Sequence, residues 1–202
     1  MGSYIEEFQE EYDKSSEVVI TVDGPSGAGK GTLAKSIAEK MDLNYYSAGD
    51  FFRKIAKENS MTVEELSEKA DKETDIEVDR RTLEKALEED CVIESRIASK
   101  VLGDFSDYSI YLTAELKERA GRVKEDLENR DNEEGGKTVE QVKEKIRKRD
   151  EDNRERYMDY YGIDMTDSEI HDIVVDNTDL NVQQQNSKVM EKLEKKFPER
   201  FD

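Results

Sequence analysis

Only one cysteine, Cys91, occurs in the 202-residue sequence, which excludes a framework of internal disulfide bonds. A chain without disulfides fits a reducing compartment such as the cytosol. Long apolar runs are also missing, because no stretch approaches the ~20 apolar residues that a membrane-spanning helix needs. The first residues lack the basic and apolar regions of a signal peptide. We therefore expect a soluble, cytoplasmic protein with no membrane partner.

Basic residues are scarce, since 32 Lys and Arg stand against 51 Asp and Glu and the formal net charge is −19. Such a charge would repel a polyanion before any local contact formed, so we expect no nucleic acid partner. One physical interpretation of the acidic excess is a cytoplasm with concentrated salt, where screening reduces self-repulsion. Histidine is nearly absent too, and a lone histidine such as His171 is more often incidental than catalytic.

The apolar residues that are present, 34% of the chain, gather in short runs separated by helical patterns. Five runs predict strands, at residues 18–22, 43–46, 91–93, 109–112 and 173–176. Strands that alternate with helices predict a three-layer α/β/α fold with a five-stranded parallel sheet covered on both faces. The length suits one domain at residues 18–202, preceded by an acidic tail at residues 1–17.

Two charged, helical regions interrupt this core pattern. Residues 58–89 form a predicted helical insert, in which Thr62 and Glu65 have the spacing of a capping box. Residues 119–161 form a predicted lid, whose helices at 116–129 and 139–161 are separated by a Gly-Gly break. Both regions are too polar to belong to the core. A last helix, predicted at residues 182–197, should complete the core.

A glycine-rich segment follows the first predicted strand and precedes a helical pattern. It comprises Gly24, Pro25, Ser26, Gly27, Ala28, Gly29 and Lys30. This is the phosphate-loop pattern, in which backbone N–H groups converge on phosphate oxygens and the lysine follows the transferred group. The usual Ser or Thr after the lysine is replaced by Gly31, and the hydroxyl arrives at Thr32. A glycine-rich turn without a ligand is the alternative, but a strand before the segment and a helix after it favour a phosphate site.

The loop ending Gly-Lys-Gly-Thr and the segment Ser-Ala-Gly-Asp-Phe-Phe-Arg at 47–53 resemble nucleoside monophosphate kinases, most closely the archaeal type of cytidylate (CMP) kinase. Further segments agree in order, at residues 94–96, 119–122, 149–157, 161–164 and 172–178. The sequence departs from the family at Ser95, where glycine is expected, and in an acidic lid stretch at 129–134. The resemblance implies a P-loop core that holds ATP, an NMP-binding insert and a closing lid.

Phosphoryl transfer needs fixed positive charges around the moving group. Arginine suits this task, because its planar fork pairs with phosphate through two bonds and stays charged. Arg53 follows a strand-end loop, and Arg96 lies just past another strand, where ligands gather in open α/β sheets. We expect both to bind the acceptor phosphate, although either could be an ordinary surface arginine.

By resemblance, Arg122 and Arg149 of the lid would join Lys30 at the transferring phosphoryl group, and Arg156 would help to hold the acceptor. Arg119 and Arg130 are reserve candidates. Charged helices are usually solvated faces with i,i+4 ion pairs, so a surface role is the alternative for each lid arginine.

Side chains with oxygen atoms near the strand ends are candidates for the metal and the acceptor nucleoside. Thr32 and Glu94 could hold Mg²⁺ and its water shell, since Mg²⁺ keeps several waters and binds few carboxylates. Ser47 and Asp50 lie where contacts to the acceptor base or ribose would fall. Glu94 could instead be an exposed acid, and residues 47–50 an ordinary helix cap.

These observations predict a phosphotransferase that moves the γ-phosphoryl group of ATP to CMP or dCMP and yields CDP or dCDP. The phosphate loop does not recognise the acceptor base, so an adenylate or uridylate kinase remains an alternative. A nucleotide-binding regulatory switch is another, although a switch needs no second set of arginines. We expect ATP, Mg²⁺ and CMP or dCMP as partners of a monomer.

Overall fold

Five parallel strands form one sheet in the order β2-β3-β1-β4-β5. The computed structural model describes residues 14–63, 65–66, 72–129 and 138–201. The strands are β1 Val19–Asp23, β2 Asn44–Ser47, β3 Cys91–Glu94, β4 Tyr108–Thr113 and β5 Ile173–Asp176. Each lies within a residue or two of a predicted run, and the predicted five-stranded parallel sheet is confirmed.

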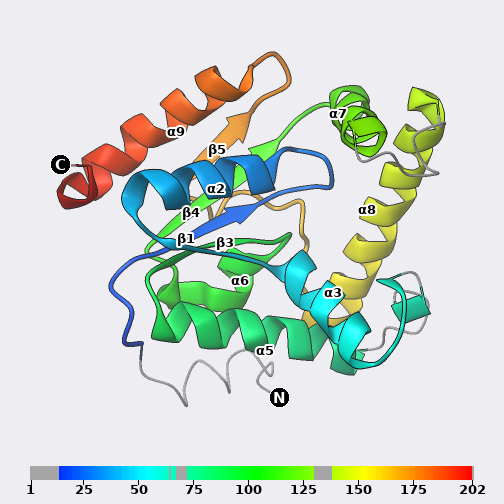
Figure 1. Ribbon diagram of the computed structural model, residues 1–202, viewed down its shortest axis with the longest axis horizontal. Coiled ribbons are helices and arrows are strands. Elements are labelled where there is room, and N and C mark those ends of the chain that lie inside the picture. Colours follow the sequence, from blue (N-terminus) through cyan, green and yellow to red (C-terminus); the bar gives the residue numbers. More distant parts are fainter. Residues whose placement is uncertain (1–13, 64, 67–71, 130–137, 202) are drawn as a thin grey trace.

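Helices cover both faces of this sheet (Figure 1). They are α2 Lys30–Met41, α3 Ala48–Glu58, α5 Lys72–Glu88, α6 Ala98–Leu102, α7 Leu116–Asn129, α8 Val139–Tyr161 and α9 Val182–Lys196, with short 3-10 turns at Gly103–Phe105 and Pro198–Arg200. Figure 1 shows α2 and α9 on one face, α5 and α6 on the other, and α3, α7 and α8 beyond the strand ends. The predicted three-layer architecture is confirmed, but α6 was not predicted, because five residues are too few to show a helical period.

The core consists of two apolar clusters, one on each face of the sheet. Ile20 and Val22 of β1 pack in the cluster with α2 and α9, whereas Val19 packs in the cluster with α5 and α6. Successive side chains of a strand point to opposite faces, so one apolar run contributes to both clusters. This double burial explains why β1 reads as a continuous run of apolar residues rather than as an alternating pattern.

The second half of α5 belongs to the core as well. Leu83 and Ala86 are fully buried and pack against Cys91 and Ile93 of β3. The predicted insert at residues 58–89 therefore includes a helix whose second half covers the sheet, whereas Val78 in its first half packs with Ile55 and Ala56 of α3. The predicted capping box is present: Thr62 and Glu65 exchange hydrogen bonds of 2.8 and 3.1 Å.

Helices α7 and α8 pack on one another beyond the strand ends, around Ala120, Val142 and Ile146. Their bounds agree with the two predicted lid helices. The Gly-Gly break, Arg130 and most of the acidic lid stretch lie outside the described residues, as do residues 1–13 of the predicted tail. None of the helices in the described ranges combines the length and apolar character that crossing a membrane requires, and the cytoplasmic location stays a prediction.

Candidate functional site

The carboxyl ends of the central strands bring the predicted site residues to one edge of the sheet. Ser47 of β2 lies opposite Glu94 of β3, and Glu94 lies opposite Val22 of β1. The phosphate-loop segment leaves β1 at this edge and continues into α2, whose first residue is Lys30. In open α/β sheets, ligands bind at this edge beside the central strand.

The backbone of the loop has a shape that only glycine allows. Gly24 has a φ angle of +139°, and a Cβ atom there would lie 2.0 Å from the backbone oxygen of Leu112. Gly27 has a φ angle of +78°, and a Cβ atom there would lie 2.9 Å from the backbone oxygen of Arg119. Any larger residue would push the loop away from β4 and α7. These two glycines fix the curvature that the phosphate-loop pattern predicted.

This loop presents unpaired donors to its interior. The backbone N–H groups of Gly27 and of residues 29–32 have no hydrogen-bond partner among the described residues. Lys30 is buried, and its Nζ donates to the backbone oxygen of Pro25 at 2.9 Å. Burial lowers the pKa of Lys30 to about 8, against the opposing effect of nearby Glu94. Free amides at a helix N-terminus beside a lysine form an anion-binding site.

Two arginines extend this positive region from the loop towards the lid. Arg96 donates from Nη2 to the Ser26 hydroxyl at 3.1 Å, and its buried Nε has no partner among the described residues. The charge of Arg96, followed by the crowding of protein atoms around the group, lowers the pKa of Arg149 to about 10, although the surface area of Arg149 is exposed. The Arg149 guanidinium makes no hydrogen bond or ion pair within the described ranges, and Arg96 also lowers the pKa of Lys30. Three cations within charge-interaction range of one another suit the negative charge of two phosphorylated substrates.

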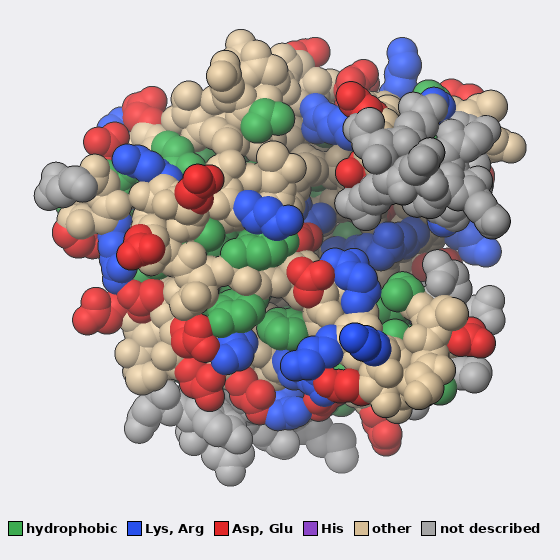
Figure 2. Space-filling view, in the orientation of Figure 1, with side chains coloured by type: hydrophobic (Ala, Val, Ile, Leu, Met, Phe, Trp, Pro, Cys, Tyr) green, Lys and Arg blue, Asp and Glu red, His purple; other side chains and the backbone are tan. Residues whose placement is uncertain are grey.

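Basic side chains gather on the face where the loop, α3 and α8 meet, although the chain is strongly acidic overall (Figure 2). A model of the cytidylate kinase-like family matches residues 19–179, which is the range that contains all of these groups. The chain belongs to the cytidylate kinase-like family.

Curated relatives of this cytidylate kinase-like chain agree with that assignment. A cytidylate kinase of Staphylothermus marinus is 38% identical over 182 residues, which cover 88% of this chain and 97% of the relative. One of Haloarcula marismortui is 41% identical over 78% of this chain and 80% of its own length. One of Pyrococcus horikoshii is 40% identical over 80% and 81%. The chain is therefore a nucleoside monophosphate kinase, and the predicted family is confirmed.

Solved structures support the fold alone. An uncharacterised protein from Eubacterium ventriosum matches with a TM-score of 0.66 and 19% identity, over 88% of this chain and 99% of the other. A shikimate kinase from Bacteroides thetaiotaomicron matches with a TM-score of 0.58 and 17% identity, over 88% and 97%. At such identities, the likeness says that this cytidylate kinase-like chain has a P-loop kinase architecture and nothing about its acceptor.

The predicted acceptor residues on α3 lie at the open side of the site. Arg53 donates to Asp50 at 2.5 Å, and both side chains are more than half exposed. Ser47 is buried and is the N-cap residue of α3, but its side chain makes no capping hydrogen bond. The alternative of an ordinary capping role for the Ser47 hydroxyl is therefore not supported, and its side chain interacts with Tyr45 instead.

Arg156 lies in a buried polar cluster between α8 and α5 that the sequence did not reveal. Its Nε is 2.9 Å from Asp75 Oδ2, and its Nη2 donates to Asn153 at 3.0 Å. One turn further along α5, Asp79 accepts a 2.7 Å hydrogen bond from Tyr161, and burial raises the pKa of Asp79 to about 7. The i,i+4 spacing of two acids that flank buried Val78 is the signal that could have identified this cluster.

Arg122 is not brought to the cations around Lys30. Its guanidinium donates to the side-chain and backbone oxygens of Asn177, both at 2.8 Å. Asn177 in turn donates to the backbone oxygen of Ala28 in the phosphate loop. Arg122 thus connects α7 to the loop after β5, and through Asn177 to the phosphate loop. Its predicted role at the transferring group remains a prediction.

Glu94 and Thr32 lie next to the same part of the phosphate loop. Tyr45 donates to Glu94 Oε2 at 3.2 Å, and burial together with Glu94 raises the pKa of Tyr45 to about 12. The same Oε2 atom is 3.6 Å from the position that a Cβ atom on Gly31 would occupy, and Thr32 follows with an exposed side chain. One carboxylate and one hydroxyl beside a phosphate site form a donor set that fits Mg²⁺.

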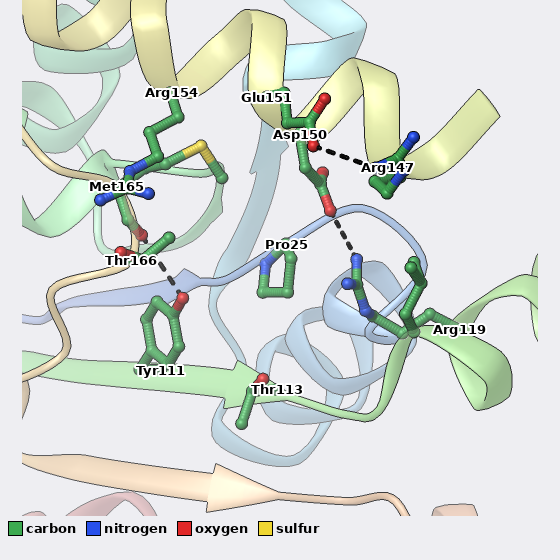
Figure 3. A pocket seen from close by; sticks show the side chains of 11 residues that line it. Pro25, Tyr111, Thr113, Arg119, Arg147, Asp150, Glu151, Arg154, Met165 and Thr166 are labelled. Carbon is green, nitrogen blue, oxygen red and sulfur yellow. Dashed lines mark hydrogen bonds and ion pairs between the residues drawn. The ribbon is translucent and has the colours of Figure 1, made fainter. Parts of the chain in front are cut away.

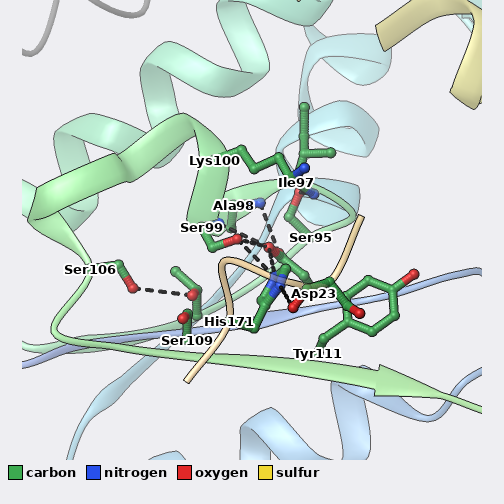
Figure 4. Close-up of polar contacts among 12 residues, drawn as sticks. Asp23, Ser95, Ile97, Ala98, Ser99, Lys100, Ser106, Ser109, Tyr111 and His171 are labelled. Carbon is green, nitrogen blue, oxygen red and sulfur yellow. Dashed lines mark hydrogen bonds and ion pairs between the residues drawn. The ribbon is translucent and has the colours of Figure 1, made fainter. Parts of the chain in front are cut away.

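Asp23, the last residue of β1, anchors the base of the site, and this role was missed in the sequence (Figure 4). Its buried carboxylate accepts hydrogen bonds from the N–H groups of Ala98 and Ser99, at 2.8 and 3.0 Å, and from the Ser99 hydroxyl. His171 Nε2 lies 3.1 Å from the same carboxylate, and both side chains are 1% exposed. The network joins β1, α6 and the segment before β5, so His171 is structural here rather than incidental.

Proposed function

We propose that the chain transfers the γ-phosphoryl group of ATP to CMP or dCMP, giving CDP or dCDP and ADP. The observation that carries this proposal is the row of free loop amides next to Lys30, Arg96 and Arg149. A site for one nucleotide needs only the amides and the lysine, so the additional arginines fit a second phosphorylated substrate. The choice of cytidine as the acceptor base rests on the names of the relatives.

In this proposal, the loop from Gly24 to Thr32 binds the ATP phosphates, and Lys30 follows the γ-phosphoryl group as it moves. Arg96 and Arg53 bind the acceptor phosphate, with Arg156, Ser47 and Asp50 closer to the nucleoside. Arg149 neutralises the charge that develops on the transferring group, and Arg122 joins it if α7 releases Asn177. No general base is required, because the acceptor phosphate is already ionised near neutral pH.

Thr32 and Glu94 would hold Mg²⁺ and its bound waters in this arrangement. When present, the ion would neutralise phosphate charge and orient the ATP tail. The residues of the chain do the remaining work, since they align both phosphates while α7 and α8, joined to the loop at Ser26, exclude water. The metal stays a proposal that depends on the fit of two oxygen donors beside Gly31.

The proposal is tested by measuring ADP formation with ATP, Mg²⁺ and each of CMP, dCMP, UMP and AMP at one concentration. We expect CMP and dCMP to be the preferred acceptors, with stoichiometric CDP or dCDP detected by chromatography. Preference for UMP or AMP would assign the chain to another acceptor, and ATP hydrolysis without diphosphate formation would favour a nucleotide switch. Omission of Mg²⁺ in a parallel series tests the metal separately.

A further inference from the structure

Ser26, at the start of the phosphate loop, is held by a closed ring of polar contacts that the mechanism above does not use. Its backbone N–H donates to Asp150 Oδ1 of α8 at 3.2 Å. Its backbone oxygen accepts from Arg119 Nη1 of α7 at 2.9 Å, and the same nitrogen donates to Asp150 Oδ2 at 2.6 Å. Figure 3 shows Asp150 and Arg119 meeting beside Pro25, at the wall of a cavity of about 450 Å³.

This ring differs from the other ion pairs of the lid. The side chains of Arg119 and Asp150 are 11% and 19% exposed, whereas Arg147 and Glu144, a pair within α8, are 54% and 67% exposed. Exposed pairs of the second kind contribute little, because water and salt screen them. The buried ring joins three separate segments of the chain, and its net charge is zero. It can therefore hold α8 in one position relative to the loop without repelling the phosphates of ATP.

Arg149, the residue before Asp150, carries a charge that is not paired in this way. It lies close enough to Arg96 for that charge to lower its pKa, and its guanidinium makes no hydrogen bond or ion pair in the described part of the chain. Like charges at short distance repel, and the charge of Asp150 opposes this effect without forming an ion pair with Arg149. Its position has to be set by the backbone of α8, and the contacts of the next residue fix that backbone on the loop.

We propose that Asp150, together with Arg119, is a positioning residue that holds Arg149 at the phosphoryl-transfer site through the Ser26 ring. Asp150 itself does not contact phosphate, since it occupies only the Ser26 N–H and leaves the amides of Gly27 and residues 29–32 available. Arg119, a reserve candidate for phosphate binding, is committed to the ring instead. The inference rests on the proposed function, because it assigns a purpose to Arg149 in that reaction.

The test is a double-mutant cycle in the full chain, with Asp150→Asn, Arg149→Ala and both changes together. Loss of one transition-state donor costs about 10²–10³-fold in kcat, and we expect that for Arg149→Ala. Asp150→Asn should lower kcat about tenfold or more, with little change in ATP affinity measured by equilibrium binding. In the Arg149→Ala background, Asp150→Asn should have less than about a twofold effect, because nothing remains to be positioned.

Controls separate positioning from general loss of structure. Asp152→Asn alters an exposed acid two residues further along α8, and we expect wild-type kcat and melting temperature. Arg119→Lys keeps the charge but loses the Nε donor that binds the Ala114 backbone oxygen at 3.1 Å and orients Nη1 towards Ser26 and Asp150. It should show the same kcat defect as Asp150→Asn, and it replaces that variant in the cycle if Asp150→Asn does not fold. Multiplicative losses in the double variant, or unchanged kcat in Asp150→Asn, would overturn the inference. Turnover of CMP by the wild-type chain in the same assay tests the proposed function independently.

Discussion

The donor half and the acceptor half of the site are built in different ways. The donor half is one continuous segment, residues 24–32, whose unpaired backbone amides lie beside a buried Lys30. The acceptor half collects side chains from α3, α8 and the end of β3, and two of its arginines are already paired with Asp50 and Asp75. The donor site is thus preorganised, whereas an acceptor has to compete with the protein's own carboxylates.

The two acceptor-side pairs differ in strength because they differ in burial. The Arg53–Asp50 pair is 60% and 58% exposed, so water and salt weaken it and a phosphate can displace Asp50 easily. The Arg156 and Asp75 side chains are 24% and 8% exposed, and breaking that pair would leave an uncompensated charge. We infer that Arg53 changes partner during binding, whereas Arg156 keeps its pair with Asp75 through Nε while it helps to hold the acceptor.

The largest effect should come from the donor half. Lys30→Ala removes the one side-chain cation among the loop amides, and we expect kcat to fall about 10²–10³-fold. Because the amides of Gly27 and residues 29–32 remain, ATP affinity should fall much less than kcat. Steady-state kinetics with CMP and a binding titration with a non-hydrolysable ATP analogue measure the two effects. A variant with wild-type kcat would remove Lys30 from the mechanism, and Lys35→Ala, an exposed lysine of α2, is the matched control.

The next effect concerns the acceptor side, where Asp79→Asn should change how stability depends on pH. Burial raises the pKa of Asp79 to about 7 in the folded chain, above its unfolded value. The contribution of protonated Asp79 to the unfolding free energy is fully present below about pH 4. It is lost as the pH rises through about 7. The shift of about three pKa units corresponds to at most about 4 kcal/mol, and a buried amide costs about 1–3 kcal/mol.

We therefore expect Asp79→Asn to raise the unfolding free energy by about 2 kcal/mol at pH 8 and to lower it at pH 5. The acceptor atom for Tyr161 is kept in this variant, so the change isolates the charge. Urea unfolding at both pH values measures it, with Glu88→Gln at an exposed position of the same helix as the control. A stability difference that is the same at both pH values would show that Asp79 does not titrate in this range.

The donor half of the site could be predicted from the sequence, and most of the acceptor half could not. The donor half lies in nine consecutive residues, and its glycines, lysine and flanking elements form a local pattern that could be recognised without the fold. The bounds of α7 and α8 were also predictable, since a Gly-Gly break and helical periodicity are local signals. These features depend on neighbours along the chain, and the structure confirms the elements they predicted.

The acceptor half and the supports of the loop depend on neighbours in space. Ser26 and Asp150 are 124 positions apart, and Asp23 and His171 are 148 apart. No periodicity or motif connects such pairs, because only the sheet order and the packing of α8 bring them together. For the same reason, Arg122 could be identified as a lid arginine from its motif, but its binding to Asn177 could not.

A smaller effect should follow from the exposed acceptor arginine. Arg53→Ala should raise KM for CMP about tenfold with little change in KM for ATP, since one charge-assisted hydrogen bond to phosphate is worth about 1.5–3 kcal/mol and part of it replaces the bond to Asp50. Lys54→Ala, which changes an exposed cation at the next position, is the control and should leave both values unchanged. Equal increases in both KM values would mean that Arg53 does not distinguish the two halves.

The smallest effect is a pH dependence that should appear only in the donor half. In the ligand-free chain, burial lowers the pKa of Lys30 to about 8, and phosphate oxygens next to it would raise that pKa again. Binding of ATP above pH 8 must then take up a proton, so the dissociation constant should increase about fourfold between about pH 7 and pH 8.5. Binding of CMP should vary less over this range, because arginines stay charged.

Calorimetry in buffers of different ionisation enthalpy would detect the proton taken up. Lys30→Arg should flatten the profile for ATP, and a wild-type profile that is already flat would mean that Lys30 keeps its charge in the free loop.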